Sequence, residues 1–112
     1  MFRQINLEDG LPTGDQAMKR LQYEVRMARR QQIRVLKIIH GYGSSGKGGK
    51  IRTLVRQELA GMQRRGAVKY FILGENLSIF DENTRKAMDY CHDFRKDADI
   101  ERHNNGITVA VL

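Results

Sequence analysis

A strand that runs directly into a glycine-rich loop and then into a basic helix dominates this sequence, at residues 35–52. The apolar run Val35–Ile39 is interrupted only by Lys37, and five of the nine residues that follow His40 are glycine. Glycine tolerates positive φ and leaves room for a ligand, so such a loop can bring several backbone N–H groups to one anion. A helix beginning near Lys50 would add the positive end of its dipole. The junction predicts an α/β fold with a phosphate-binding edge, where His40 ends the strand.

Charge is distributed unevenly along the chain. The 112 residues include 20 Lys and Arg against 13 Asp and Glu, a net charge of +7 with a pI of about 9.9. Such a balance favours nucleic acid as partner, ahead of an anionic membrane surface. Residues 25–57 contain no acid but nine basic residues: Arg26, Arg29, Arg30, Arg34, Lys37, Lys47, Lys50, Arg52 and Arg56. Residues 75–101 hold eight acids and four bases, so we expect a basic face with the acidic segment on the opposite side.

The remaining composition points to a reducing compartment. The single cysteine, Cys91, allows no internal disulfide, and it falls on the apolar edge of an expected helix, where we expect it to be buried. No apolar run approaches 18 residues, and the N-terminal residues lack the apolar stretch of a signal peptide. The three histidines are dispersed, without zinc spacing. We therefore expect a cytoplasmic protein with no membrane contact and no metal or other cofactor, and the sequence identifies no protein partner.

Periodicity predicts four strands and three helices in a single domain, residues 1–112. A chain of this length supports one core of one sheet and a few helices. The early crossovers favour parallel pairing, so we expect a two-layer α/β sandwich with a four-stranded mixed sheet, in the order β-α-β-α-β-α-β. The helical segment at about 74–105 precedes a last strand apolar enough to lie between others. The strands are expected at 2–7, 33–39, 68–73 and 106–112, and the helices from about 13 to 31, from about 50 to 66, and from a cap at Asp81.

Two nucleotide-binding motifs overlap the glycine-rich loop, but each is incomplete. Gly41–Gly48 satisfies the glycine and lysine positions of a Walker A loop, yet Gly48 stands where Ser or Thr would hold magnesium. The spacing Gly41-x-Gly43-x-x-Gly46 also fits the dinucleotide fingerprint, without the acidic residue expected about twenty positions later. A flexible connector is the plain alternative. The lysines in and beside the loop favour a phosphate site over a connector.

The same segment resembles the small MutS-related (Smr) domain. That family has a strand running into His-Gly-x-Gly, a Gly/Lys turn and a helix beginning Leu-Arg, and the matching residues here are His40, Gly41, Gly43, Lys47 or Lys50, and Ile51-Arg52. The final strand, Gly106–Leu112, matches the family form Gly-(Val/Ile)-Thr-x-x-x-Leu. The resemblance covers most of the chain and implies nucleic-acid binding, to RNA or branched DNA.

The chain departs from the family in its first motif, Leu-Asp-Leu-His-Gly-Leu-(Ser/Thr). The corresponding stretch runs from Ile5 to Thr13, with Asn6 in place of the Asp and Glu8-Asp9 where the His would stand. A second departure is residues 74–105, where typical members have a short glycine-rich link. The resemblance implies a nicking or RNA-cleaving endonuclease with a degenerate first motif, so activity stays an open alternative.

The expected site residues follow from these patterns. If the chain cleaves, His40 would act as general base, and Glu8 and Asp9 would be the catalytic carboxylates, with a divalent metal as possible cofactor. If it only binds, cationic side chains would neutralise phosphates with little sequence preference. The expected nucleic-acid contacts, at the loop or beside it, are His40, Gly41, Gly43, Lys47, Lys50, Arg52, Arg29, Arg30 and Arg34.

Overall fold

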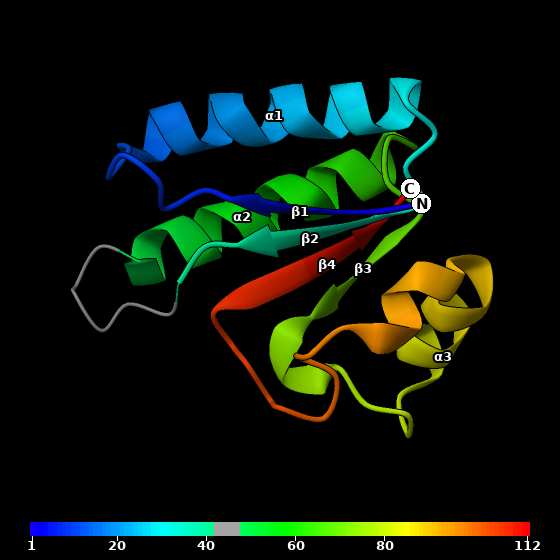
Figure 1. The fold of residues 1–112 in the computed structure, drawn as a ribbon. Coiled ribbons are helices and arrows are strands. Elements are labelled where there is room, and N and C mark those ends of the chain that lie inside the picture. The colour runs from blue at the N-terminus through cyan, green and yellow to red at the C-terminus, as the bar shows by residue number, and fades with distance from the viewer. Residues whose placement is uncertain (42–47) are drawn as a thin grey trace.

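The fold is a four-stranded mixed sheet with helices on both faces, as Figure 1 shows in the computed structural model. The structure describes residues 1–41 and 48–112. The strands are β1 (Phe2–Asn6), β2 (Val35–Ile39), β3 (Tyr70–Leu73) and β4 (Ile107–Val111). The longer helices are α1 (Gly14–Arg30), α2 (Gly48–Arg64) and α3 (Glu82–Tyr90), and the 3₁₀ turns are η1 (Gly74–Asn76) and η2 (His92–Lys96). The expected element order and mixed sheet are confirmed.

The strand order is β1-β2-β4-β3, with β1 parallel to β2 and β4 antiparallel to both of its neighbours. The largely apolar last strand therefore lies between two others, as its composition predicts, and every residue of β4 is buried. The connection through α1 carries the chain back across the sheet, which parallel pairing of β1 with β2 requires. Their C-terminal ends consequently meet at one edge of the sheet, where the glycine-rich segment leaves β2 (Figure 1).

The two faces of the sheet carry separate apolar clusters. Leu36 and Ile38 of β2 pack with residues of α1 and α2, whereas Val35 of the same strand packs against α3 and η2. This alternation follows from the period of two along a strand. Residues from α3 and η2, among them Cys91 and Phe94, thus add a smaller layer on the second face, and the expected burial of Cys91 is confirmed.

The helix boundaries have identifiable local causes. Thr13 caps α1 through a reciprocal pair of hydrogen bonds with Gln16, and Asp81 caps α3 by accepting from the Thr84 N–H at 2.8 Å. The expected Asp81 cap is therefore confirmed. None of the helices in the described ranges is long and apolar enough to cross a membrane.

Candidate nucleic-acid interface

The edge where β1 and β2 end together brings Glu8 next to Gly41. Asn6 pairs with Ile39 in the parallel register, and the Leu7 N–H donates to the Ile39 carbonyl at 2.8 Å. The two strands therefore end at the same level. A Cβ added to Gly41 would lie 2.7 Å from Oε1 of Glu8, and Gly41 has a φ of 77°. The positive φ favours glycine at this position, whereas the exposed Glu8 side chain could move away from a Cβ. The carboxylate of Glu8 thus stands at the base of the glycine-rich segment.

Asp9 takes a different place in the same turn. Its backbone carbonyl accepts a hydrogen bond from Nη1 of Arg20 on α1, at 3.0 Å, which ties the turn after β1 to the first helix. Glu8 and Asp9 are both exposed. The structure therefore brings Glu8 to the edge of the site, while the backbone contact of Asp9 holds the turn to α1.

His40 lies beneath this edge and is fully buried. Its position continues the alternation of β2, so the ring points toward the α2 face. Nδ1 lies 2.7 Å from the Gly41 carbonyl oxygen, and Nε2 lies 2.8 Å from Oγ1 of Thr108 on β4. The same Oγ1 accepts a hydrogen bond from Nε of Arg56 at 3.0 Å. Both ring nitrogens are therefore engaged inside the protein.

These contacts determine the tautomer of His40. A carbonyl oxygen can only accept, so Nδ1 carries the proton and donates it to Gly41. The Thr108 hydroxyl accepts from Arg56 and is left to donate to Nε2, which is unprotonated. Burial, together with the nearby positive charges of Arg56 and Arg52, lowers the pKa of His40 from 6.5 to about 4. A phosphate contact or a general-base step by His40 would require these hydrogen bonds to break first.

Arg56, on α2, connects this network to Glu75 of η1. Nη1 and Nη2 donate to the two carboxylate oxygens of Glu75 at 3.0 and 2.7 Å, and Nη2 also donates to the Ile107 carbonyl at 3.2 Å. Although burial alone would raise the pKa of Glu75, the hydrogen bonds and charge of Arg56 lower it overall. The chain His40–Thr108–Arg56–Glu75 thereby fixes β2, β4, α2 and η1 to one another directly under the candidate site.

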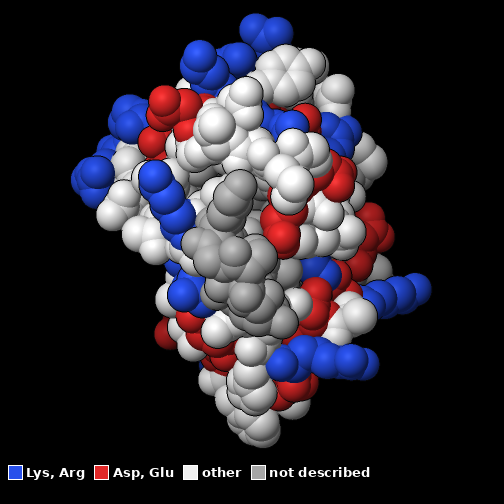
Figure 2. Space-filling model, turned by 90° about the vertical axis from the view of Figure 1, so that its left-hand side faces the viewer, with Lys and Arg blue, Asp and Glu red and all other residues white. Residues whose placement is uncertain are grey.

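The first turns of α2 present the free cations of this edge. The first turn contains no acidic residue, Lys50 is exposed and Arg52 is partly exposed. Arg52 lines an open groove of about 510 Å³ along α2 that also reaches Arg56 and Glu75. Figure 2 shows this end of the molecule, on which blue Lys and Arg side chains and red acidic side chains are interspersed. Lys50, Arg52 and the helix N-terminus therefore supply local positive charge within a surface of mixed sign.

Several expected site residues fall outside the described part of the chain. Gly43 and Lys47 lie in residues 42–47, so their expected contacts remain predictions. The Walker A and dinucleotide interpretations depend mainly on the same residues and likewise stay alternatives.

The expectation that Arg29, Arg30 and Arg34 lie beside the loop is wrong. Arg29 and Arg30 end α1, and Arg34 precedes β2, whereas the loop follows the opposite end of β2. Figure 1 shows that the C-terminal end of α1 and the start of α2 lie at opposite ends of the sheet. Nearness in sequence is misleading here because the strand between them spans the sheet. These arginines belong to a different surface.

Acidic residues of the segment 75–101 form ion pairs with basic residues of the segment 25–57, so the expected separation of the two on opposite sides is wrong. Lys37, on the strand face opposite His40, is 5% exposed and forms ion pairs with Asp97, at 2.9 Å, and with Asp99. Burial alone would lower the pKa of Lys37, but the hydrogen bonds and charges of Asp99 and Asp97 raise it overall. Lys37 and Arg56 are thus paired with acids from residues 75–101, and Lys37 contributes nothing to a basic surface.

Sequence reasoning missed the polar residues that support the site. Thr108 is fully buried, and its role depends on a partner 68 positions away. The lone Lys37 in an apolar strand was the one available signal, since a buried charge requires an opposite charge nearby.

No metal centre is formed by the described residues. They contain no group of three or more His, Cys, Asp or Glu side chains placed to hold an ion. Glu8 and Asp99 do line a common small cavity of about 180 Å³ beside Gly41. Asp99 is already paired with Lys37 and accepts from Asn104 at 3.0 Å. Glu8 and Asp9, by contrast, make no side-chain hydrogen bond or ion pair with the described residues.

Comparison with known proteins agrees with this architecture. The family model of the Smr domain matches residues 10–75, which is more than half of the chain. The crystal structure of the Smr domain of Thermus thermophilus MutS2 is similar in fold, with a TM-score of 0.61. The two chains are 20% identical, and the match covers 98% of this chain and 96% of that one. No curated protein matches this sequence.

Proposed function

Because this chain belongs to the Smr domain family, which is known for nucleic-acid binding and nicking, we propose that it binds the phosphate backbone of RNA or branched DNA where β1 and β2 end. The observation that supports this most directly is the start of α2. There an acid-free first turn, exposed Lys50 and partly exposed Arg52 surround the end of a parallel strand pair. A helix N-terminus and mobile cations together suit a phosphate.

The buried network beneath the edge gives His40 and Gly41 a defined part in this proposal. His40 donates to the Gly41 carbonyl, and Gly41 has a left-handed backbone conformation. This hydrogen bond orients the peptide from which the glycine-rich segment departs. His40 therefore acts as a positioning residue for the loop, and Lys50 and Arg52, with Lys47, supply the charge that meets phosphate.

Fluorescence anisotropy tests the proposal with labelled single-stranded RNA, duplex RNA and branched DNA, each over a salt series. Each phosphate contact contributes about 0.7 to 0.9 to the slope of log affinity against log salt. We expect Lys47→Ala with Lys50→Ala to reduce that slope by about 1.5 units. Lys86→Ala with Lys96→Ala is the matched control, because it removes the same charge from exposed positions on α3 and η2. Equal losses in the two double variants would contradict a site at the loop.

A second candidate function, metal-dependent cleavage of a phosphodiester, is favoured by the position of Glu8 over Gly41. An oxygen ligand at this edge suits magnesium or manganese, and Asp9 and His40 are the other expected participants. Glu8→Gln separates the two functions. If Glu8 holds a metal for cleavage, the variant loses cleavage in magnesium or manganese. If the site only binds, no cleavage occurs in the parent, and the variant binds more tightly because a negative charge beside the phosphate is gone.

A further inference from the structure

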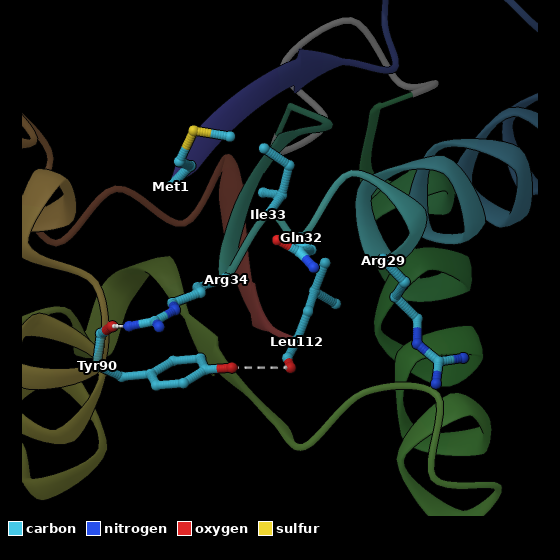
Figure 3. A pocket seen from close by; sticks show the side chains of 7 residues that line it. All are labelled: Met1, Arg29, Gln32, Ile33, Arg34, Tyr90 and Leu112. Atoms are coloured by element: carbon cyan, nitrogen blue, oxygen red, sulfur yellow. Dashed lines mark hydrogen bonds between the residues drawn. The ribbon is translucent and has the colours of Figure 1, made fainter.

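A second basic surface lies at the opposite end of the sheet from the glycine-rich segment. Two open cavities of about 640 and 430 Å³ meet there, and Arg29 lines both. Figure 3 shows the larger one, where Arg34 and Tyr90 face each other across its floor while Arg29 extends from the end of α1. Arg26, Arg30 and Arg65 line the smaller cavity. Neither cavity has an Asp or Glu in its lining among the described residues.

Arg34 is held in place on this surface without being neutralised. Nη1 of Arg34 donates to the Tyr90 carbonyl at 2.8 Å, and the guanidinium carbon lies 4.9 Å from the centre of the Tyr90 ring. Arg26, Arg29, Arg30 and Arg34 are all exposed. Arg65 has an acidic partner, Glu58, at 3.4 Å, but the Arg65 side chain is largely exposed, and a long contact of this kind contributes little. Most of the positive charge is therefore available to a ligand.

The chemistry of the lining favours phosphate over a base or an apolar partner. Guanidinium groups match phosphate oxygens in a two-pronged geometry that ammonium groups lack. The ring of Tyr90 already has Arg34 over it and Nζ of Lys69 at 5.4 Å, which leaves little room for a base to stack. Among the exposed apolar side chains that would suit a membrane or protein partner, Met1 lines the larger cavity, whereas Phe80 and Ile79 lie outside both.

This surface is well separated from the first. The 17 residues of α1 span about 25 Å at 1.5 Å per residue, and the helix runs from one end of the sheet to the other. That separation is about three times the screening length of roughly 8 Å at physiological salt. Charges at the two ends therefore contribute independently to binding, and each end neutralises its own phosphates.

We propose that Arg26, Arg29, Arg30, Arg34 and Arg65 form a second phosphate-backbone site, so that one domain holds two segments of nucleic acid at once. The inference rests on the proposed function, because it assigns nucleic acid as the ligand of both ends. A branched substrate would offer one arm to each site. An acidic protein segment is the competing ligand for the arginine surface.

The test compares Arg29→Ala with Arg30→Ala, Lys47→Ala with Lys50→Ala, and the control Lys86→Ala with Lys96→Ala. Both arginines are exposed at the end of α1, and alanine is a good helix former, so the fold should be retained, as circular dichroism would verify. We expect each of the first two pairs to lower the salt slope for branched DNA by about 1.5 units. The control should leave it within about 0.3 units.

A bridging assay supplies the second readout. One duplex is immobilised, the protein is added, and capture of a second, labelled duplex is measured, with the protein shown to be monomeric by light scattering. We expect the parent and the control to capture the second duplex and both site variants to lose at least three quarters of the capture.

The outcomes separate the two proposals. If the arginine variant keeps the parental slope and capture while the lysine variant loses both, the second site is wrong and the proposed function stands. If the parent binds none of the nucleic acids, both are wrong, and an acidic peptide that binds the parent but not the arginine variant would identify the competing ligand.

Discussion

Acidification from pH 7 to pH 4 is expected to destabilise this domain mainly through His40. The ring is neutral in the folded state, where burial lowers its pKa from 6.5 to about 4. Because the folded pKa lies below the unfolded one, the stabilising contribution is complete above pH 6.5 and is lost as the pH falls toward 4. A tenfold change in proton affinity corresponds to about 1.4 kcal/mol, so the loss is about 2 kcal/mol at pH 5 and about 3 kcal/mol at pH 4. The lowered pKa values of Glu75 and Asp99 act in a more acidic window, below their ordinary values.

Urea unfolding between pH 7 and pH 4.5 measures this loss, with His40→Gln as the comparison variant. Whatever its absolute stability, the variant should show a flatter dependence of unfolding free energy on pH, because its side chain does not titrate. Nitrogen-15 NMR of the imidazole tests the cause directly, with protonated Nδ1 and unprotonated Nε2 expected at neutral pH. A His40 pKa near 6.5, or a parental stability that stays constant from pH 7 to pH 5, would refute the buried network.

Three substitutions test the packing around the site by chemical denaturation. Lys37→Met should cost about 3 kcal/mol, because it leaves Asp97 and Asp99 without their buried cation; a loss below about 1 kcal/mol would contradict that pairing. Thr108→Val should cost about 2 kcal/mol, since Nε of Arg56 loses its acceptor and Nε2 of His40 loses its donor, whereas unchanged stability would mean that neither bond matters. Gly74→Ala should cost about 3 kcal/mol, because its Cβ would overlap the Asn104 carbonyl. An unchanged stability would show that the backbone of residue 74 lies farther from the Asn104 carbonyl than the structure has it.

The fold was predictable because its signals are local. The helical stripe of α1, the cap at Asp81 and the short apolar strands each depend on residues close together in the sequence. The position of β4 between two neighbours follows from its largely apolar composition. Parallel pairing of β1 with β2 follows from the helix between them.

The site was less predictable because it depends on long-range contacts. The sequence predicts that His40 faces a ligand, but its partner Thr108 lies in the last strand and draws the ring into the interior. Arg34 is predicted beside the loop because it is only a few residues away in sequence, yet β2 carries the chain across the whole sheet between them. Periodicity predicts which face of the sheet a side chain lies on, whereas the residues that it contacts there depend on how distant strands and helices assemble.

The central claim is that nucleic acid binds where β1 and β2 end, and an NMR titration tests it most directly. Amide shifts of the nitrogen-15-labelled protein would be followed while branched DNA is added at low salt. We predict large shifts at Gly41, Lys50 and Arg52, with little change across residues 82–89 of α3. Saturation with no shift at these residues, or with shifts confined to α3, would contradict the claim.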